Sequence, residues 1–82
     1  MKPKQTVANV KDAVKAHYRA ECGETPLRFE TTRCAFNAER HLWVLECRVK
    51  CQTYTDLRVM RCFVSDEDAT VVAEDEIERE GV

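Results

Sequence analysis

The sequence predicts an α+β domain in which one N-terminal helix packs on a three- to four-stranded antiparallel β-meander, a two-layer sandwich. Apolar residues recur with a period of 3.6 before Gly23 and with a period of two after Pro26. The polar segments between the strands are short, and short connections join antiparallel neighbours. With 82 residues the chain forms one domain. We predict it over residues 1–76, followed by an acidic, frayed C-terminal tail at residues 77–82.

The helix is predicted over Val7–Glu21. Thr6 has the hydroxyl side chain that is typical of an N-cap, and Gly23 follows at the position where a glycine commonly ends a helix. Four apolar residues at helical spacing form one stripe, and that stripe is the surface expected to face the sheet. The stripe consists of Val7, Val10, Val14 and Tyr18.

The first two strands follow Pro26. Alternation begins at Leu27, and the apolar phase shifts between Thr31 and Arg33, which indicates a β-bulge. After a turn the chain alternates without error over residues 43–51, so one face of this strand is expected to be buried. Its longest apolar run, residues 42–45, is far too short to cross a membrane.

A third strand is predicted over residues 54–64, and a fourth over residues 70 to about 75. The intervening turn contains Asp66, Glu67 and Asp68. We interpret these carboxylates as a solvated hairpin turn, because the loop lacks the length and the central glycine of an EF-hand.

Five cysteines are present, and an odd number cannot close into disulfides alone. The first residues lead into no apolar stretch of a secretory signal, so we expect a cytoplasmic protein with reduced thiols. The cysteines are expected to pack as small buried hydrophobes. Whether Cys34, Cys47 and Cys62 converge on a metal stays open.

Catalysis is not expected. The sequence contains no nucleophile elbow and no zinc-protease motif, and its two glycines are too few for a phosphate-binding loop. We therefore predict a protein that is not an enzyme and that needs no cofactor.

A small basic patch is the main argument for nucleic-acid binding. Arg48 and Lys50 share one face of the second strand, and Arg61 can join them from the third. The formal net charge of −2 argues against such binding, and so do the eight acidic residues after Val64. Weak binding of single-stranded nucleic acid is therefore an alternative hypothesis, beside a cysteine-ligated metal or redox protein.

The most informative feature is an excess of apolar residues on the second face of the sheet. One helix covers one face only, so an apolar second face needs another cover. We predict a small interaction or assembly module that binds a protein partner or forms a homodimer through this face, with the C-terminal segment around Ile77 folding back as the alternative cover. The predicted interface residues are Leu42, Val44, Leu57, Val59 and Phe63.

The helix, the glycine-containing break and the tryptophan-bearing strand Leu42–Val49 resemble the gas-vesicle accessory family in outline. The order of elements is also similar to PepSY-type domains. The resemblance covers much of residues 10–76 in outline and implies no role for an individual residue. The five cysteines belong to neither pattern.

Overall fold

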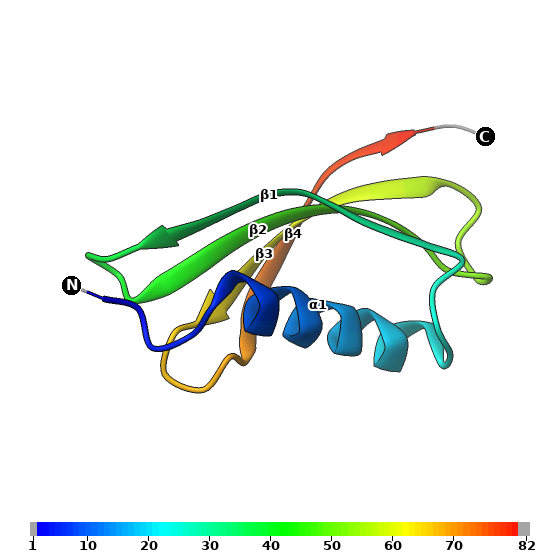
Figure 1. Cartoon of the computed structure of the whole chain (residues 1–82). Helices are drawn as coiled ribbons and strands as arrows, with labels where there is room; N and C mark the ends of the chain where they lie inside the picture. The colour runs from blue at the N-terminus through cyan, green and yellow to red at the C-terminus, as the bar shows by residue number, and fades with distance from the viewer. Residues whose placement is uncertain (1, 81–82) are drawn as a thin grey trace.

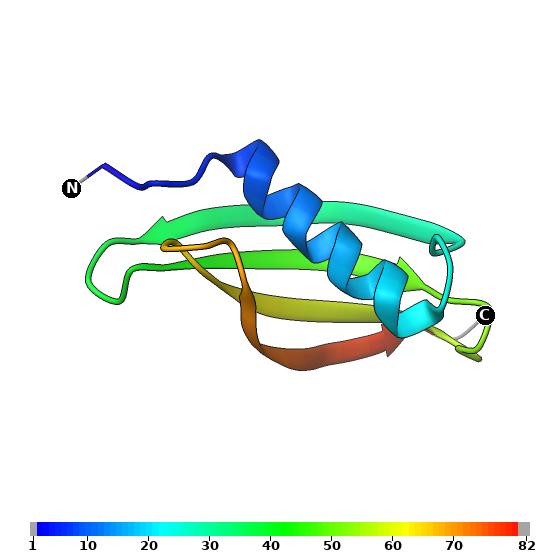
Figure 2. The same ribbon diagram turned by 90° about the horizontal axis from the view of Figure 1, so that it is seen from below.

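A single helix covers one face of a four-stranded antiparallel sheet in the computed structural model, which describes residues 2–80 (Figure 1). The strands lie in chain order, and the helix crosses them obliquely (Figure 2). The predicted α+β fold is confirmed. The elements are α1 (Val7–Cys22), β1 (Arg28–Asn37), β2 (Leu42–Lys50), β3 (Leu57–Ser65) and β4 (Val71–Glu80).

Local interactions set the two ends of α1 as the sequence predicts. The Thr6 hydroxyl accepts a hydrogen bond from the Asn9 N–H at 3.1 Å. Gly23 has a φ of 78°, in the left-handed region, and its N–H donates to the Ala20 carbonyl. Three stripe residues, Val10, Val14 and Tyr18, are buried, whereas Val7 in the first turn is 44% exposed. Within residues 2–80, no helix has the length and apolarity needed to cross a membrane.

The core lies between α1 and the two central strands. The residues of β2 alternate strictly, and Trp43, Leu45, Cys47 and Val49 all face the helix. Met60, Cys62 and Val64 of β3 join them. The predicted bulge is confirmed by a shift in register between Thr31 and Arg33.

Two strand boundaries differ from the prediction. β3 begins at Leu57 instead of residue 54, because the chain turns after β2 and the Tyr54 N–H donates to the Cys51 carbonyl at 3.1 Å. β4 continues to Glu80, beyond the expected end near Asp75. Of the predicted frayed tail, residues 81–82 lie outside the described part of the chain.

The alternative prediction, that the segment around Ile77 folds back over the second face of the sheet, is wrong. The segment around Ile77 stays in the sheet as part of β4, hydrogen-bonded beside β3. Ile77 itself is 41% exposed. The pairing of β4 with β3 is interrupted by two register shifts, between Val59 and Met60 and between Phe63 and Val64.

Asp66 corrects the prediction of a fully solvated turn. Its side chain is 2% exposed. It accepts hydrogen bonds from the N–H groups of Lys4 and Gln5 and, at 2.9 Å, from the indole Nε1 of Trp43. The buried carboxylate therefore fastens the segment before α1 to the turn between β3 and β4, which is a long-range role that turn composition cannot reveal.

Candidate interaction face and a histidine–carboxylate cluster

The sheet face that points away from α1, here called the open face, carries one uninterrupted apolar row. The register pairs Ala35 with Val44, Val44 with Phe63, and Phe63 with Ala73. These four side chains, the apolar row, cross the whole sheet from edge to edge. Val44 and Phe63 stay half-buried at its centre, and the two alanines are exposed at its ends.

A row of alternating charge lies next to the apolar row. Register places Arg33 beside Glu46, Glu46 beside Arg61, and Arg61 beside Asp75. Arg61 Nε donates to Glu46 Oε2 at 3.2 Å. From β1 to β4 the signs of this charged row read positive, negative, positive, negative.

A shallow groove of about 760 Å³ follows the two rows. It begins at the turn between β1 and β2 and extends across β3. Both rows contribute three members to its lining, namely Ala35, Val44 and Phe63 with Arg33, Glu46 and Arg61. The open face is therefore slightly hollowed where apolar and charged side chains meet.

The five predicted interface residues share the open face without forming one patch. Leu42 and Val44 lie at the apolar-row end of β2, with Phe63 opposite Val44. Leu57 and Val59 lie at the other end of β3, beyond the charged row. All five are half-buried. The charged row thus divides the predicted interface into a group of three residues and a group of two.

The predicted basic patch is divided by local contacts. Arg61 is paired with Glu46 within the charged row. Lys50 Nζ donates to the carbonyls of Cys51 and Tyr54, so it caps the loop after β2. Arg48 lies on the same face of β2, between Glu46 and Lys50.

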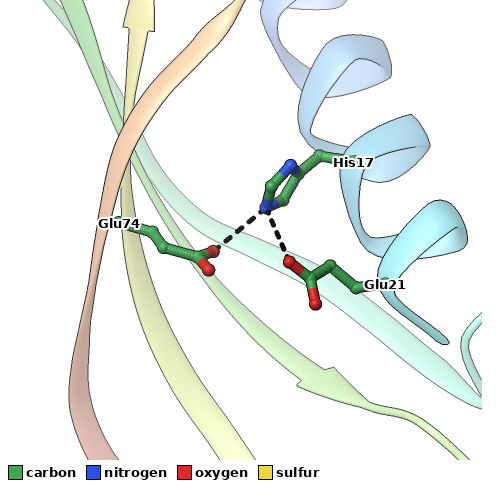
Figure 3. Close-up of side chains that lie close together, drawn as sticks. All are labelled: His17, Glu21 and Glu74. Atoms are coloured by element: carbon green, nitrogen blue, oxygen red, sulfur yellow. Dashed lines mark hydrogen bonds and ion pairs between the residues drawn. The ribbon is translucent and has the colours of Figure 1, made fainter.

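A separate cluster joins α1 to β4 on the covered side of the sheet (Figure 3). His17 Nε2 lies 3.2 Å from Glu74 Oε2 and 3.8 Å from Glu21 Oε1. His17 and Glu21 are one helical turn apart, which brings them to the same face of α1. The Tyr18 hydroxyl donates to Glu74 Oε2 at 2.7 Å and so holds the carboxylate in place.

The Tyr18 hydroxyl links this cluster to a cysteine in the core. Tyr18 Oη lies 3.5 Å from Cys62 Sγ. Burial, together with its contacts to Cys62 and Glu74, raises the pKa of Tyr18. The hydrogen bond to Cys62, reinforced by burial, raises the pKa of Cys47. Cys47 is fully buried, which confirms its predicted place in the core.

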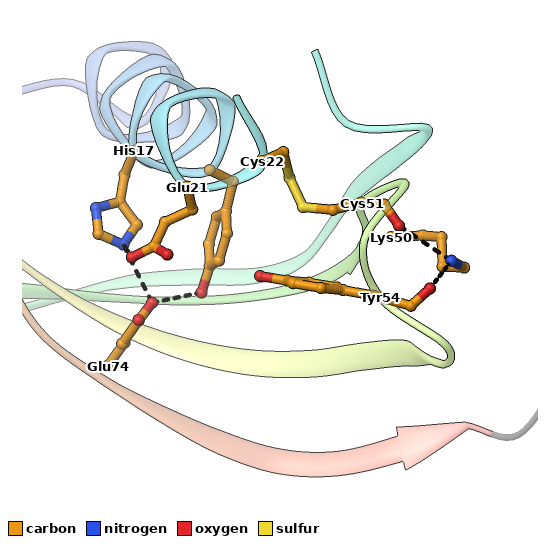
Figure 4. The surroundings of a disulfide bond; sticks show 8 residues. His17, Glu21, Cys22, Lys50, Cys51, Tyr54 and Glu74 are labelled. Carbon is orange, nitrogen blue, oxygen red and sulfur yellow. Dashed lines mark hydrogen bonds and ion pairs between the residues drawn. A yellow bond between two sulfur atoms is a disulfide. The ribbon is translucent and has the colours of Figure 1, made fainter. Parts of the chain in front are cut away.

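The prediction that all five cysteines are reduced is wrong. Cys22 at the end of α1 forms a disulfide with Cys51 just after β2, with Tyr54 alongside (Figure 4). The Cα atoms of the pair are 5.4 Å apart, a normal separation for a disulfide. Packing of α1 brings these residues together across 29 positions of sequence. The three remaining cysteines are free, and they are Cys34, Cys47 and Cys62.

Sequence reasoning missed the histidine–carboxylate cluster. The spacing of His17 and Glu21 is a visible signal, but it is common on solvated helices. The third member, Glu74, comes from a strand far along the chain, so only the packing of α1 against β4 identifies it.

Comparison with protein families, curated proteins and solved structures finds no match to this chain. The outline resemblance to gas-vesicle accessory proteins and PepSY-type domains therefore receives no support.

Proposed function

We propose that this chain is a small non-catalytic interaction module that forms a homodimer through the open face of its sheet. The observation that carries the proposal is the charged row beside the apolar row. An apolar strip alone fits many partners. A strip beside alternating charges is far more selective, since its partner must present the opposite sequence of signs.

A second copy of the chain presents that sequence. Two sheets that stack around a two-fold axis parallel to their strands place β1 over the partner's β4 and β2 over the partner's β3. Arg33 then lies opposite the partner's Asp75, and Glu46 lies opposite the partner's Arg61. The apolar row meets the apolar row of the second copy. A two-fold axis perpendicular to the strands would instead oppose like charges.

The proposed contact is centred on these two rows. One row further along, register aligns Glu30, Arg48, Val59 and Glu78. The same two-fold axis would bring Glu30 against the partner's Glu78, which is repulsive. Stacked twisted sheets cross at roughly 30°, so their corners separate. We therefore place Leu57 and Val59 at the margin of the interface.

The expected affinity is modest. Burying an apolar side chain of this size contributes about 1.5–3 kcal/mol, and Val44 and Phe63 are already half-buried in one copy. Association costs roughly 4–15 kcal/mol in lost freedom. Attraction between the two charged rows therefore has to supply part of the free energy of association. We expect a salt-sensitive dimer in the micromolar range.

Pairing through β4, one of the two edge strands, is disfavoured. Exposed strand edges invite addition of another strand, and charged side chains oppose it. Beyond its first three residues β4 carries Glu74, Asp75, Glu76 and Glu78. Two such edges would repel each other, whereas the open face presents both signs of charge.

The disulfide bears on where the module works. Disulfides persist in oxidising compartments and are rare in the cytosol. The cytoplasmic expectation depended on reduced thiols, so it is not carried into the proposal, and the Cys22–Cys51 bond favours a non-reducing compartment.

Sedimentation velocity on two matched variants tests the proposal. Phe63→Lys introduces a charge into the apolar row and should make the protein monomeric at concentrations where the wild type dimerises. Val59→Lys introduces the same residue into the same strand and face, at the margin, and should leave most of the dimer intact. Circular dichroism should show the native fold in both variants.

Three results would contradict the proposal. The wild type could sediment as a monomer throughout the micromolar range. Phe63→Lys could dimerise as well as the wild type does. Both variants could weaken the dimer equally, which would place the contact elsewhere on the open face.

A further inference from the structure

We infer that His17, Glu21 and Glu74 form a zinc-binding site that joins α1 to the edge strand β4. This site is on the covered side of the sheet, and the inference does not depend on the proposed dimer. The three residues offer one imidazole nitrogen and two carboxylate oxygens, all within 4.8 Å of one another.

The distances between the ligand atoms match the coordination geometry of zinc. Zinc binds imidazole nitrogen and carboxylate oxygen at about 2.0–2.2 Å in a tetrahedral arrangement, so adjacent ligand atoms lie roughly 3.3 Å apart. The observed separations from His17 Nε2 are 3.2 Å to Glu74 and 3.8 Å to Glu21. The Glu21 and Glu74 oxygens lie within 4.8 Å of each other. The two carboxylates therefore need to approach by no more than about 1.5 Å for the three residues to fill three of the four positions.

Neighbouring interactions hold one ligand in place and restrain the backbone beside a second before any metal binds. Tyr18 is 1% exposed, and its hydroxyl donates to the Glu74 carboxylate at 2.7 Å. Such outer hydrogen bonds orient metal ligands and strengthen binding. The disulfide at Cys22 fixes the end of the helix directly after Glu21. The arrangement is thus restrained from both α1 and β4.

The ligand chemistry selects the metal. Two carboxylates neutralise the charge of a divalent cation, and a histidine ligand favours zinc over the oxygen-preferring Ca²⁺ and Mg²⁺. With three protein ligands, the fourth position is left for water or for a group from another molecule. Because His17 is partly exposed, that position is accessible from solvent.

Isothermal titration calorimetry with Zn²⁺ tests the site on oxidised, chelator-treated protein that carries no histidine tag. The wild type should bind one equivalent saturably, and about 100 µM Zn²⁺ should raise its melting temperature because the metal binds the folded state. His17→Ala should weaken binding at least tenfold. Glu74→Gln keeps an acceptor for the Tyr18 hydroxyl but lowers affinity, because it removes a charged ligand.

His41→Asn is the matched control. It removes the only other histidine, which lies in the turn between β1 and β2 at a positive φ of 54° that asparagine tolerates. Its zinc affinity should equal that of the wild type. Equal affinity of His17→Ala and the wild type, or no saturable binding by the wild type, would overturn the inference.

A Co²⁺ titration separates this site from the free cysteines. Cobalt bound by the histidine and two carboxylates should show visible ligand-field bands without the thiolate charge-transfer band. If that band appears, and disappears in Cys34→Ser, the metal is on sulfur and the inference is wrong.

Discussion

The two faces of the sheet differ in the polarity and the burial of their side chains. On the covered face, every β2 residue that points to α1 is apolar and at most 5% exposed. On the open face, the alternate residues of the same strand begin apolar at Leu42 and Val44 and then become charged at Glu46, Arg48 and Lys50. A single strand therefore supplies a complete core on one side and a mixed surface on the other.

The two faces also differ in how they are attached to the rest of the chain. The covered face stabilises the fold and is closed at both ends. Asp66 attaches the segment before α1 at one end, and the Cys22–Cys51 disulfide attaches α1 at the other. Among residues 2–80, the open face carries no such attachment, and its apolar and charged side chains are arranged in rows across the strands. Substitutions on the two faces should therefore have different consequences.

The largest expected effect is on the covered face. Trp43→Ala should lower the free energy of unfolding by about 3–5 kcal/mol, because it leaves a large cavity and removes the indole donor to Asp66. Val44→Ala, one residue along and on the open face, should cost far less. Urea titration of both variants checks this. A loss for Trp43→Ala below about 1 kcal/mol, the average for point substitutions, would refute the packing described.

The disulfide should contribute slightly less to the free energy of unfolding than the Trp43 side chain does. Closing a loop of 29 residues stabilises the folded state by about 3.5 kcal/mol in the chain-entropy account. Adding a reductant to the wild type should shift the urea midpoint accordingly, and Cys34→Ser should show the same shift. Alkylation of the unfolded, unreduced protein should label three thiols. Labelling of all five would show that the bond is absent.

Asp66 should make a smaller contribution to stability than Trp43 or the disulfide, and this contribution depends on pH. Burial by itself raises the pKa of Asp66, but hydrogen bonds from Lys4, Gln5 and Trp43 lower it below its ordinary value. Its contribution to stability is therefore complete above the unfolded pKa of about 3.9 and is lost as pH falls through the lower folded pKa.

Denaturant titrations of the wild type and Asp66→Asn across pH measure this contribution. The difference in unfolding free energy between them should be constant near neutral pH and should narrow below about pH 4. Glu67→Gln, which alters only an exposed pair with Lys4, serves as the control and should change the free energy of unfolding little. A difference that widens as the pH falls would contradict the lowered pKa.

Local patterns were sufficient to predict much of the covered face. The N-cap at Thr6, the left-handed Gly23 and the alternation through β2 are all encoded by near neighbours in sequence, and the structure confirms them. The fold class and the bulge before Arg33 could be predicted for the same reason.

Contacts between distant segments could not be predicted. Cys22 meets Cys51, and Glu74 meets His17, only once α1 has packed on the sheet. Asp66 is an acidic turn residue in sequence, and its burial depends on donors from the N-terminal segment. The charged row requires the register of all four strands, which includes three shifts that the sequence does not locate fully.

A charge exchange across the two edges of the sheet tests the proposed dimer most directly. Arg33 lies on β1 and Asp75 on β4, so within one chain they are three strand spacings apart, about 14 Å. Each can oppose the other closely only between two copies.

Sedimentation equilibrium should show weaker dimers for Arg33→Glu and for Asp75→Arg, each of which places like charges in contact. The double variant should recover most of the lost affinity, because it restores opposite charges across the interface while leaving their separation within the chain unchanged. The proposed dimer would be contradicted if the double variant lost as much affinity as the two single variants lose together.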